Sequence, residues 1–182
     1  MKKYLVLLLI FWGTACAPIQ KLIASPTLMP MSQINLETIL VIDGDLPEDI
    51  VPDIVTRENA VGSAAELDRA DAVFTQYFLL NGGEGGGVSV FLFDSLDDVG
   101  AAFEKVSAFM TAPIVYDQVG EQARIEYFFL PVITDVPSIE GSRLIFTHCH
   151  ALTVIQFPRA DDLEAIEKYG LRLDGRIQML VC

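Results

Sequence analysis

The strongest structural signal in the sequence is a pair of apolar runs on either side of a glycine-rich stretch. Residues 72–80 (AVFTQYFLL) and 88–93 (VSVFLF) are rich in β-branched and aromatic side chains, which favour strands. Asn81 and five glycines among residues 82–87 lie between them. Two such runs around a flexible connection predict a β-hairpin, with residues 82–87 as its loop.

The segment after this hairpin predicts an amphipathic helix. Ser95 stands three residues before Asp98, which is a pattern typical of a helix start, because the hydroxyl can accept a backbone amide hydrogen bond. Apolar side chains then recur at helical spacing, at Leu96, Val99, Phe103, Val106 and Met110. We therefore expect a helix that runs from about Ser95 to about Thr111 and buries one face.

Three more strands and a second helix are predicted along the rest of the chain. Strand-like runs cover residues 123–130, 143–147 and 151–157. A helix is expected to begin at Asp161 or Asp162, with the apolar stripe Leu163, Ile166, Leu173, Ile177 and Leu180. The order β-β-α-β-β-β-α predicts an α+β fold, in which a mostly antiparallel sheet carries its helices on one face as a sandwich. Residues 36–182 are expected to form this single domain.

The first fifteen residues have the composition of a secretory signal peptide. Lys2 and Lys3 precede an apolar run over residues 4–12, and three small residues then lead to Cys16. The run is shorter than the roughly 20 residues that a membrane-spanning helix requires. We therefore expect residues 1–15 to be removed on export. Residues 16–35, rich in Pro, Ser, Thr and Met, are expected to form a flexible tether.

The junction at Cys16 resembles the lipobox of bacterial lipoproteins, in which the cysteine receives a diacylglyceryl group. Thr14 and Ala15 match the small residues of that motif, whereas Gly13 stands where the family has an aliphatic side chain. The resemblance implies a lipid anchor at Cys16 and a location on the extracytoplasmic side of the cell membrane or outer membrane. Two alternatives are an uncleaved anchor and an ordinary signal-peptidase cut, which Pro18 disfavours because it lacks an N–H.

Three short motifs lie at corresponding places of the predicted layout: residues 45–47 (DLP), 93–95 (FDS) and 119–121 (VGE). With them, residues 36–182 resemble a class of uncharacterised extracytoplasmic lipoprotein domains, which are similar to PsbP/Mog1-like sandwiches. The resemblance implies an α+β fold used for sensing or assembly. It implies no shared chemistry.

The remaining cysteines favour a disulfide. If Cys16 carries lipid, Cys149 and Cys182 form an even pair in an oxidising compartment, where disulfides persist. Two unpaired thiols and a reactive or metal-binding pair are the alternatives, because the sequence does not give the distance between the two Cα atoms.

The two histidines of the chain flank a cysteine and are the metal-ligand candidates. On a continuous strand, the imidazoles of His148 and His150 would share one face. Zinc requires three or four protein ligands, and a strand would point Cys149 the other way. The sequence therefore favours a solvated hairpin tip, and we predict neither a metal nor another cofactor.

Two further motifs are interpreted as structural. The acidic cluster in residues 43–49 lacks the ligand frame of an EF-hand and is expected to be a solvated turn. The glycines at 82–87 connect two strands without the Lys-Ser/Thr of a phosphate loop. The aromatic side chains Phe91, Phe93 and those at 127–129 are expected in the core, or alternatively along a small-ligand cleft.

Charge and motif content restrict the function classes. Removal of residues 1–15 takes away Lys2 and Lys3 and so changes the formal net charge from −13 to −15, which disfavours binding to nucleic acid. No Gly-x-Ser-x-Gly motif or other catalytic constellation is visible. We expect a non-catalytic, lipid-anchored binding or scaffolding protein whose partner is an envelope protein or a small ligand. The alternatives are an envelope hydrolase with paired carboxylates and a metal-binding protein that uses His148 and His150.

Overall fold

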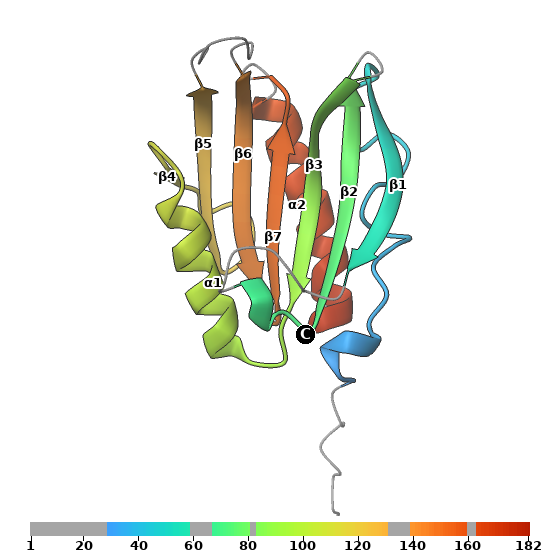
Figure 1. The fold of residues 1–182 in the computed structure, drawn as a ribbon, viewed down its shortest axis with the longest axis vertical. Coiled ribbons are helices and arrows are strands. Elements are labelled where there is room, and N and C mark those ends of the chain that lie inside the picture. Colours follow the sequence, from blue (N-terminus) through green and yellow to red (C-terminus); the bar gives the residue numbers. More distant parts are fainter. Residues whose placement is uncertain (1–28, 59–66, 81–82, 131–138, 160–162) are drawn as a thin grey trace, which may run out of the picture.

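In the computed structural model of the chain, residues 29–58, 67–80, 83–130, 139–159 and 163–182 are described (Figure 1). They form one antiparallel sheet of seven strands in the order β1-β2-β3-β7-β6-β5-β4. The strands are β1 (Ile50–Glu58), β2 (Ala72–Leu80), β3 (Gly83–Leu92), β4 (Ile114–Val115), β5 (Gln122–Leu130), β6 (Ile139–His148) and β7 (Ala151–Phe157). The helices are α1 (Leu96–Ala108) and α2 (Leu163–Val181), with short 3-10 turns η1 (Met31–Gln33) and η2 (Leu67–Arg69). The predicted α+β class and the antiparallel sheet are confirmed.

The glycine-rich stretch is strand rather than loop. β3 begins at Gly83 and pairs with β2 along its whole length, so that residues 81–82 alone separate the two strands. Gly86 has a φ of 139°, and a Cβ on it would lie 2.2 Å from the Gln156 backbone oxygen. Glycine is required there, because the backbones of β3 and β7 approach too closely for a side chain. The hairpin is confirmed, but its predicted loop is wrong.

The long helix α2 covers one face of the sheet. It lies behind the strands in Figure 1 and buries Ile166, Leu173 and Ile177 completely. These side chains belong to one cluster with residues of several strands, among them Phe74, Phe78, Leu144, Phe146, Ile155 and Phe157. The predicted apolar stripe is wrong at its last residue. Leu180 is exposed, and the neighbouring Val181 is buried instead.

The shorter helix α1 covers the opposite face. Ser95 is its N-cap and accepts a hydrogen bond from the Asp98 amide, as the sequence predicts. Its buried residues pack in a second cluster, which contains Val73, Phe91, Val99, Phe103, Ile145 and Leu152. The prediction that both helices share one face is therefore wrong. The physical reason is that neighbours such as Leu144 and Ile145 are both fully buried, so that both faces of a central strand need a cover.

The segment before β1 is held against α2. Leu36 and Leu40 are fully buried, and the Tyr169 hydroxyl donates a 2.6 Å hydrogen bond to the Leu40 carbonyl. The buried Asp45 carboxylate accepts from Arg176 at 2.7 Å. Met31 and Ile34 belong to the same core cluster. The folded part therefore begins a few residues before the expected tether boundary at residue 35.

A disulfide joins the end of α2 to the turn between β6 and β7. The Cys149 and Cys182 sulfurs are 2.08 Å apart, and their Cα atoms are separated by 5.6 Å. Cys149 occupies the turn with a φ of 44°. The predicted pairing of these two cysteines is therefore present in the structure, where it closes a segment of 33 residues.

Replacement of Tyr169 by Phe should alter stability at alkaline pH. Burial raises the pKa of Tyr169 above its ordinary value of 10.0, while the nearby Arg176 lowers it and Asp45 raises it. The folded chain therefore retains a proton that the unfolded chain releases, and the free energy of unfolding should fall as the pH rises above about 10. Tyr169→Phe should lose this part of the pH dependence.

Urea denaturation between about pH 8 and about pH 11 measures this effect. At neutral pH the variant should lose about 1 kcal/mol, because the hydrogen bond to Leu40 is removed. Tyr77→Phe is the control variant, because it removes the hydroxyl of a half-exposed tyrosine. Equal alkaline slopes for wild type and Tyr169→Phe would contradict the assignment.

Loss of the disulfide should lower stability substantially. The Cys149→Ser, Cys182→Ser double variant should lose about 3–4 kcal/mol in free energy of unfolding, because the cross-link restricts the unfolded chain over 33 residues. Urea denaturation in the presence of a chelator is the measurement. Reduced wild type is the matched comparison and should unfold at the same urea concentration as the variant. A loss below about 1 kcal/mol would show that the cross-link contributes little.

Candidate functional site

The structure gives the two histidines different hydrogen-bond partners. His148 Nδ1 lies 2.6 Å from an oxygen of Asp174, on α2. His150 Nδ1 instead donates to the Phe93 carbonyl at 2.8 Å, beside the end of β3. The two imidazoles are thus held by different partners on different sides of the turn. The group of close potential ligand atoms in the described residues contains His148 and the two cysteines rather than both histidines.

Asp174 connects three parts of the fold. One carboxylate oxygen contacts His148, and the other accepts a 3.0 Å hydrogen bond from the Gly120 amide. Both the imidazole and the carboxylate are largely buried, with 14% and 17% of each side chain exposed. Asp174 therefore fixes the orientation of His148 and joins α2 to the loop before β5.

His148, Cys149 and Cys182 do come together. One potential ligand atom of each lies within 4.8 Å of the other two. In this structure the two sulfurs are bonded to each other, so neither is a thiolate that could bind a metal. Cys16, the expected lipidation site, lies outside the described residues.

The acidic cluster at residues 43–49 is dispersed. Asp45 is buried and pairs with Arg172 and Arg176, whereas Asp49 pairs with Arg159 at 2.7 Å. These carboxylates are directed to different partners. The prediction of a solvated turn is therefore wrong at Asp45. Its carboxylate connects the N-terminal segment to α2.

Most of the aromatic candidates are core residues. Phe91, Phe93 and Phe128 are buried, with 7%, 0% and 8% of their surface exposed. Tyr127 is exposed, and the side chain of Phe129 lies outside the described part of the chain. The four described members of this set, Phe91, Phe93, Tyr127 and Phe128, do not line the depression described next.

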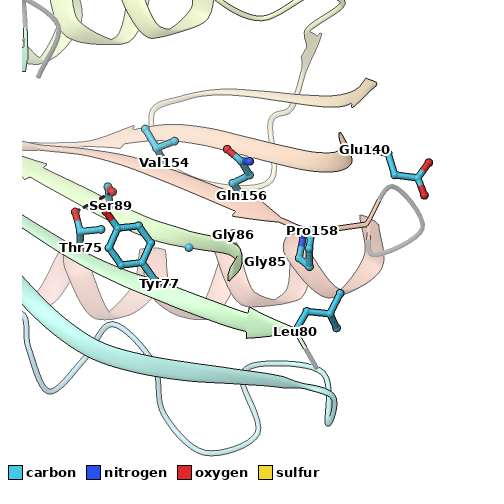
Figure 2. Close-up of a pocket in the computed structure, with 11 residues that line it drawn as sticks. Thr75, Tyr77, Leu80, Gly85, Gly86, Ser89, Glu140, Val154, Gln156 and Pro158 are labelled. Carbon is cyan, nitrogen blue, oxygen red and sulfur yellow. Dashed lines mark hydrogen bonds between the residues drawn. The ribbon is translucent and has the colours of Figure 1, made fainter. Parts of the chain in front are cut away.

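A wide depression lies on the α1 side of the sheet, at the end where β2 meets β3. It has a volume of about 620 Å³, within the range of small-molecule sites. Figure 2 shows its lining: Thr75, Tyr77, Leu80, Gly85, Gly86, Gly87, Ser89, Glu140, Val154, Gln156 and Pro158. Among these described lining residues, Glu140 alone carries a charge at neutral pH.

One row of side chains crosses the floor on three neighbouring strands. Thr75 pairs with Ser89, and Ser89 pairs with Val154, so all three project from the same face. The Thr75 and Ser89 hydroxyls are 3.0 Å apart and hydrogen-bonded. Both residues are partly exposed, so each hydroxyl can still form a hydrogen bond with a ligand.

The next row leaves a gap at its centre. Tyr77 pairs with Gly87, and Gly87 pairs with Gln156. Because glycine has no side chain, open space remains between the phenol of Tyr77 and the amide of Gln156. A Cβ on Gly87 would lie 2.7 Å from the Gln76 carbonyl oxygen, so another residue would force the backbone to shift. Gly87 thus has two effects. It allows the neighbouring strands to pair closely, and it leaves a hollow in the floor of the depression.

The depression is not predicted by the sequence patterns described above, although one signal for it is present. On β2, the residues that face α1 change from Val73 to Thr75 and Tyr77, which is an apolar-to-polar change along one face. The strand β7 was predicted, but its pairing with β3 was not, because the paired ends Leu92 and Ala151 are 59 positions apart in the sequence. None of the helices in the described part is long and apolar enough to cross a membrane.

Comparison with protein-family models, with curated proteins and with solved structures finds no significant match to this chain. A function must therefore be inferred from the residues of the chain and their geometry.

Proposed function

We propose that the protein is a lipid-anchored, non-catalytic binding module of the cell envelope that holds a neutral polar ligand in the depression of Figure 2. The observation that carries this proposal is the combination of volume and lining. A cavity of about 620 Å³ presents two hydroxyls, an amide and a phenol beside exposed strand backbone. Ligand sites combine such convergent polar groups with an aromatic wall.

The lining favours a ligand that carries hydroxyl and amide groups. Thr75, Ser89 and Gln156 each donate and accept hydrogen bonds. Tyr77 adds a ring that is 48% exposed and can pack against an apolar face of the ligand. Because Glu140 is the one charge among the described lining residues, a phosphorylated or strongly anionic ligand is disfavoured.

The chemistry of the lining supports binding rather than catalysis. Among the described lining residues there is no histidine, lysine or cysteine that could activate the Ser89 hydroxyl. Two buried carboxylates are paired with arginines. Glu126 forms an ion pair with Arg143. Asp45 forms ion pairs with Arg172 and Arg176. Acids that are paired in this way serve the fold and are not available as a catalytic pair.

The proposed location rests on the sequence of residues 1–16 and is supported by the cross-link. A disulfide such as Cys149–Cys182 persists in oxidising compartments. The described chain starts at the end of the sheet that carries the β6–β7 turn, and Met31 is bonded there to Asp94 at 2.9 Å (Figure 1). A lipid at Cys16 would therefore hold that end near the bilayer, with the depression at the far end.

Anchoring should depend on Cys16. When the full chain is expressed in a bacterial host, wild type should enter the detergent phase on phase partitioning, and its intact mass should include a diacylglyceryl group. Cys16→Ser should move to the aqueous phase, because a lipid chain supplies most of the membrane affinity. The Cys149→Ser, Cys182→Ser variant is the control and should remain in the detergent phase. An aqueous wild type without added mass would refute the anchor.

Ligand binding should depend on Tyr77. The probe is an oligomer of N-acetylglucosamine, which is neutral and carries hydroxyl and amide groups. We expect it to shift the NMR amide signals of Thr75, Ser89 and Gln156, and we expect Tyr77→Ala to weaken binding by about tenfold, which is about 1.4 kcal/mol.

Tyr127→Ala is the matched control for this experiment, because Tyr127 is 46% exposed and lies on β5, outside the depression. This variant should bind as wild type does, and inorganic phosphate should shift none of the same signals. If the neutral probe leaves the depression signals unchanged, or if both tyrosine variants weaken binding equally, the proposal is wrong.

A further inference from the structure

We propose that reduction of the Cys149–Cys182 disulfide creates a site for a thiophilic divalent cation of the zinc class, with His148 and the two thiolates as ligands. The site lies at the opposite end of the sheet from the depression and is independent of it (Figure 1). In the oxidised protein the same residues form a cross-link. The turn would thus exchange a disulfide for a metal bridge.

Potential ligand atoms of the three residues lie close together. One atom each of His148, Cys149 and Cys182 lies within 4.8 Å of the others. Around zinc, with Zn–S of about 2.3 Å and Zn–N of about 2.0 Å, tetrahedral ligand atoms lie about 3.4–3.8 Å apart. After reduction the two sulfurs are no longer bonded and can move apart to this spacing. Cys182 follows the last residue of α2 and is exposed, so its side chain has room to rotate.

The imidazole is oriented as a metal ligand commonly is. Asp174 holds Nδ1 of His148 at 2.6 Å, and its second oxygen is fixed by the Gly120 amide. The free nitrogen of the ring is therefore Nε2. A carboxylate on the other nitrogen fixes the tautomer and makes the ligating nitrogen more basic.

A fourth coordination position is open. A cavity of about 150 Å³ adjoins both cysteines and is also lined by Leu96, Glu121, His150 and Val181. It has room for a water molecule, and Glu121 is the one carboxylate among the described lining residues. Three protein ligands with one open position are a known arrangement for zinc.

The chemical steps balance with a dithiol reductant. A reductant thiolate attacks one sulfur, the Cys149–Cys182 bond breaks, and the second thiol of the reductant closes its own disulfide. Two electrons and two protons pass to the protein, which then holds two thiols. Binding of the cation releases these two protons to solvent, because thiolates are the ligands. The exposed Cys182 gives a reductant access.

Cobalt(II) provides a direct readout. The full chain is reduced with a dithiol under anaerobic conditions, freed of reductant and titrated with cobalt. We expect one cobalt per chain, with sulfur-to-cobalt charge-transfer bands and the intense visible bands of tetrahedral cobalt, which zinc then displaces. The oxidised protein and the Cys149→Ser, Cys182→Ser variant should show none of these bands.

Three histidine-region variants test the ligand set. Asp174→Asn should weaken binding about 10- to 100-fold, as loss of an orienting partner does elsewhere, and His148→Ala should weaken it further. His150→Ala tests the other imidazole, which bonds to Phe93 and lines the cavity beside the cysteines, and it should weaken binding less than His148→Ala does.

Folding is monitored by near-ultraviolet circular dichroism and by the thermal midpoint, which zinc should raise in the reduced wild type and not in the double serine variant. That comparison tests the thiolate ligands even if His148→Ala fails to fold, since both proteins lack the cross-link. Wild-type affinity in a folded His148→Ala, equal cobalt binding by the oxidised protein, or no cobalt binding by reduced, folded wild type would each overturn the proposal.

Discussion

The structure depends on the burial of both faces of its central strands. Leu144 and Ile145 on β6, and Ala151 and Leu152 on β7, are each fully buried although they point to opposite sides. Each face therefore needs its own helix, and the two helices differ in length. α2 has nineteen residues and spans about 28 Å, whereas α1 has thirteen and spans about 20 Å. Strands of nine or ten residues are about 30–34 Å long, so α1 leaves one end of its face uncovered, and the depression lies there.

The helix α2 also organises the parts of the chain that the sheet does not hold. Along its length it contacts the N-terminal segment through Tyr169 and Arg176, the β6–β7 turn through Asp174, and the same turn again through the disulfide. A buried hydrogen bond and a partly buried ion pair are each worth about 1–3 kcal/mol. Together with the cross-link, they make the position of the turn, and so of His148, dependent on one rigid element.

The sequence allowed prediction of the elements whose pattern is local. The hairpin of β2 and β3, the N-cap at Ser95 and the pairing of Cys149 with Cys182 all follow from spacing, chemistry or parity within the chain. The edge strand β1 was missed because an edge has no need of alternation: Val51 and Ile54 are exposed, and Pro52 and a register shift interrupt its pairing.

Features that depend on which strands become neighbours could not be predicted. The pairing of β3 with β7 sets Gly87 beside Gln156 and so creates the hollow in the floor, but no local pattern records that contact. The distribution of the helices is of the same kind. The sequence of an apolar strand does not show which helix covers it. Ile145 was therefore compatible with a sheet that has helices on one face and with a sheet that has helices on both.

The two proposed sites lie at opposite ends of the same strands, and this separation has a consequence for an anchored protein. Twelve residues lie between Cys16 and Met29, and a fully extended chain of that length reaches about 40 Å. The domain adds about 30 Å along its strands. A ligand in the depression would then be held on the distal side of the molecule, up to about 70 Å from the bilayer. The disulfide turn would face the membrane, where a membrane-bound dithiol reductant could reach Cys182. The ligand and the reductant would thus approach the protein from opposite ends, and neither would obstruct the other.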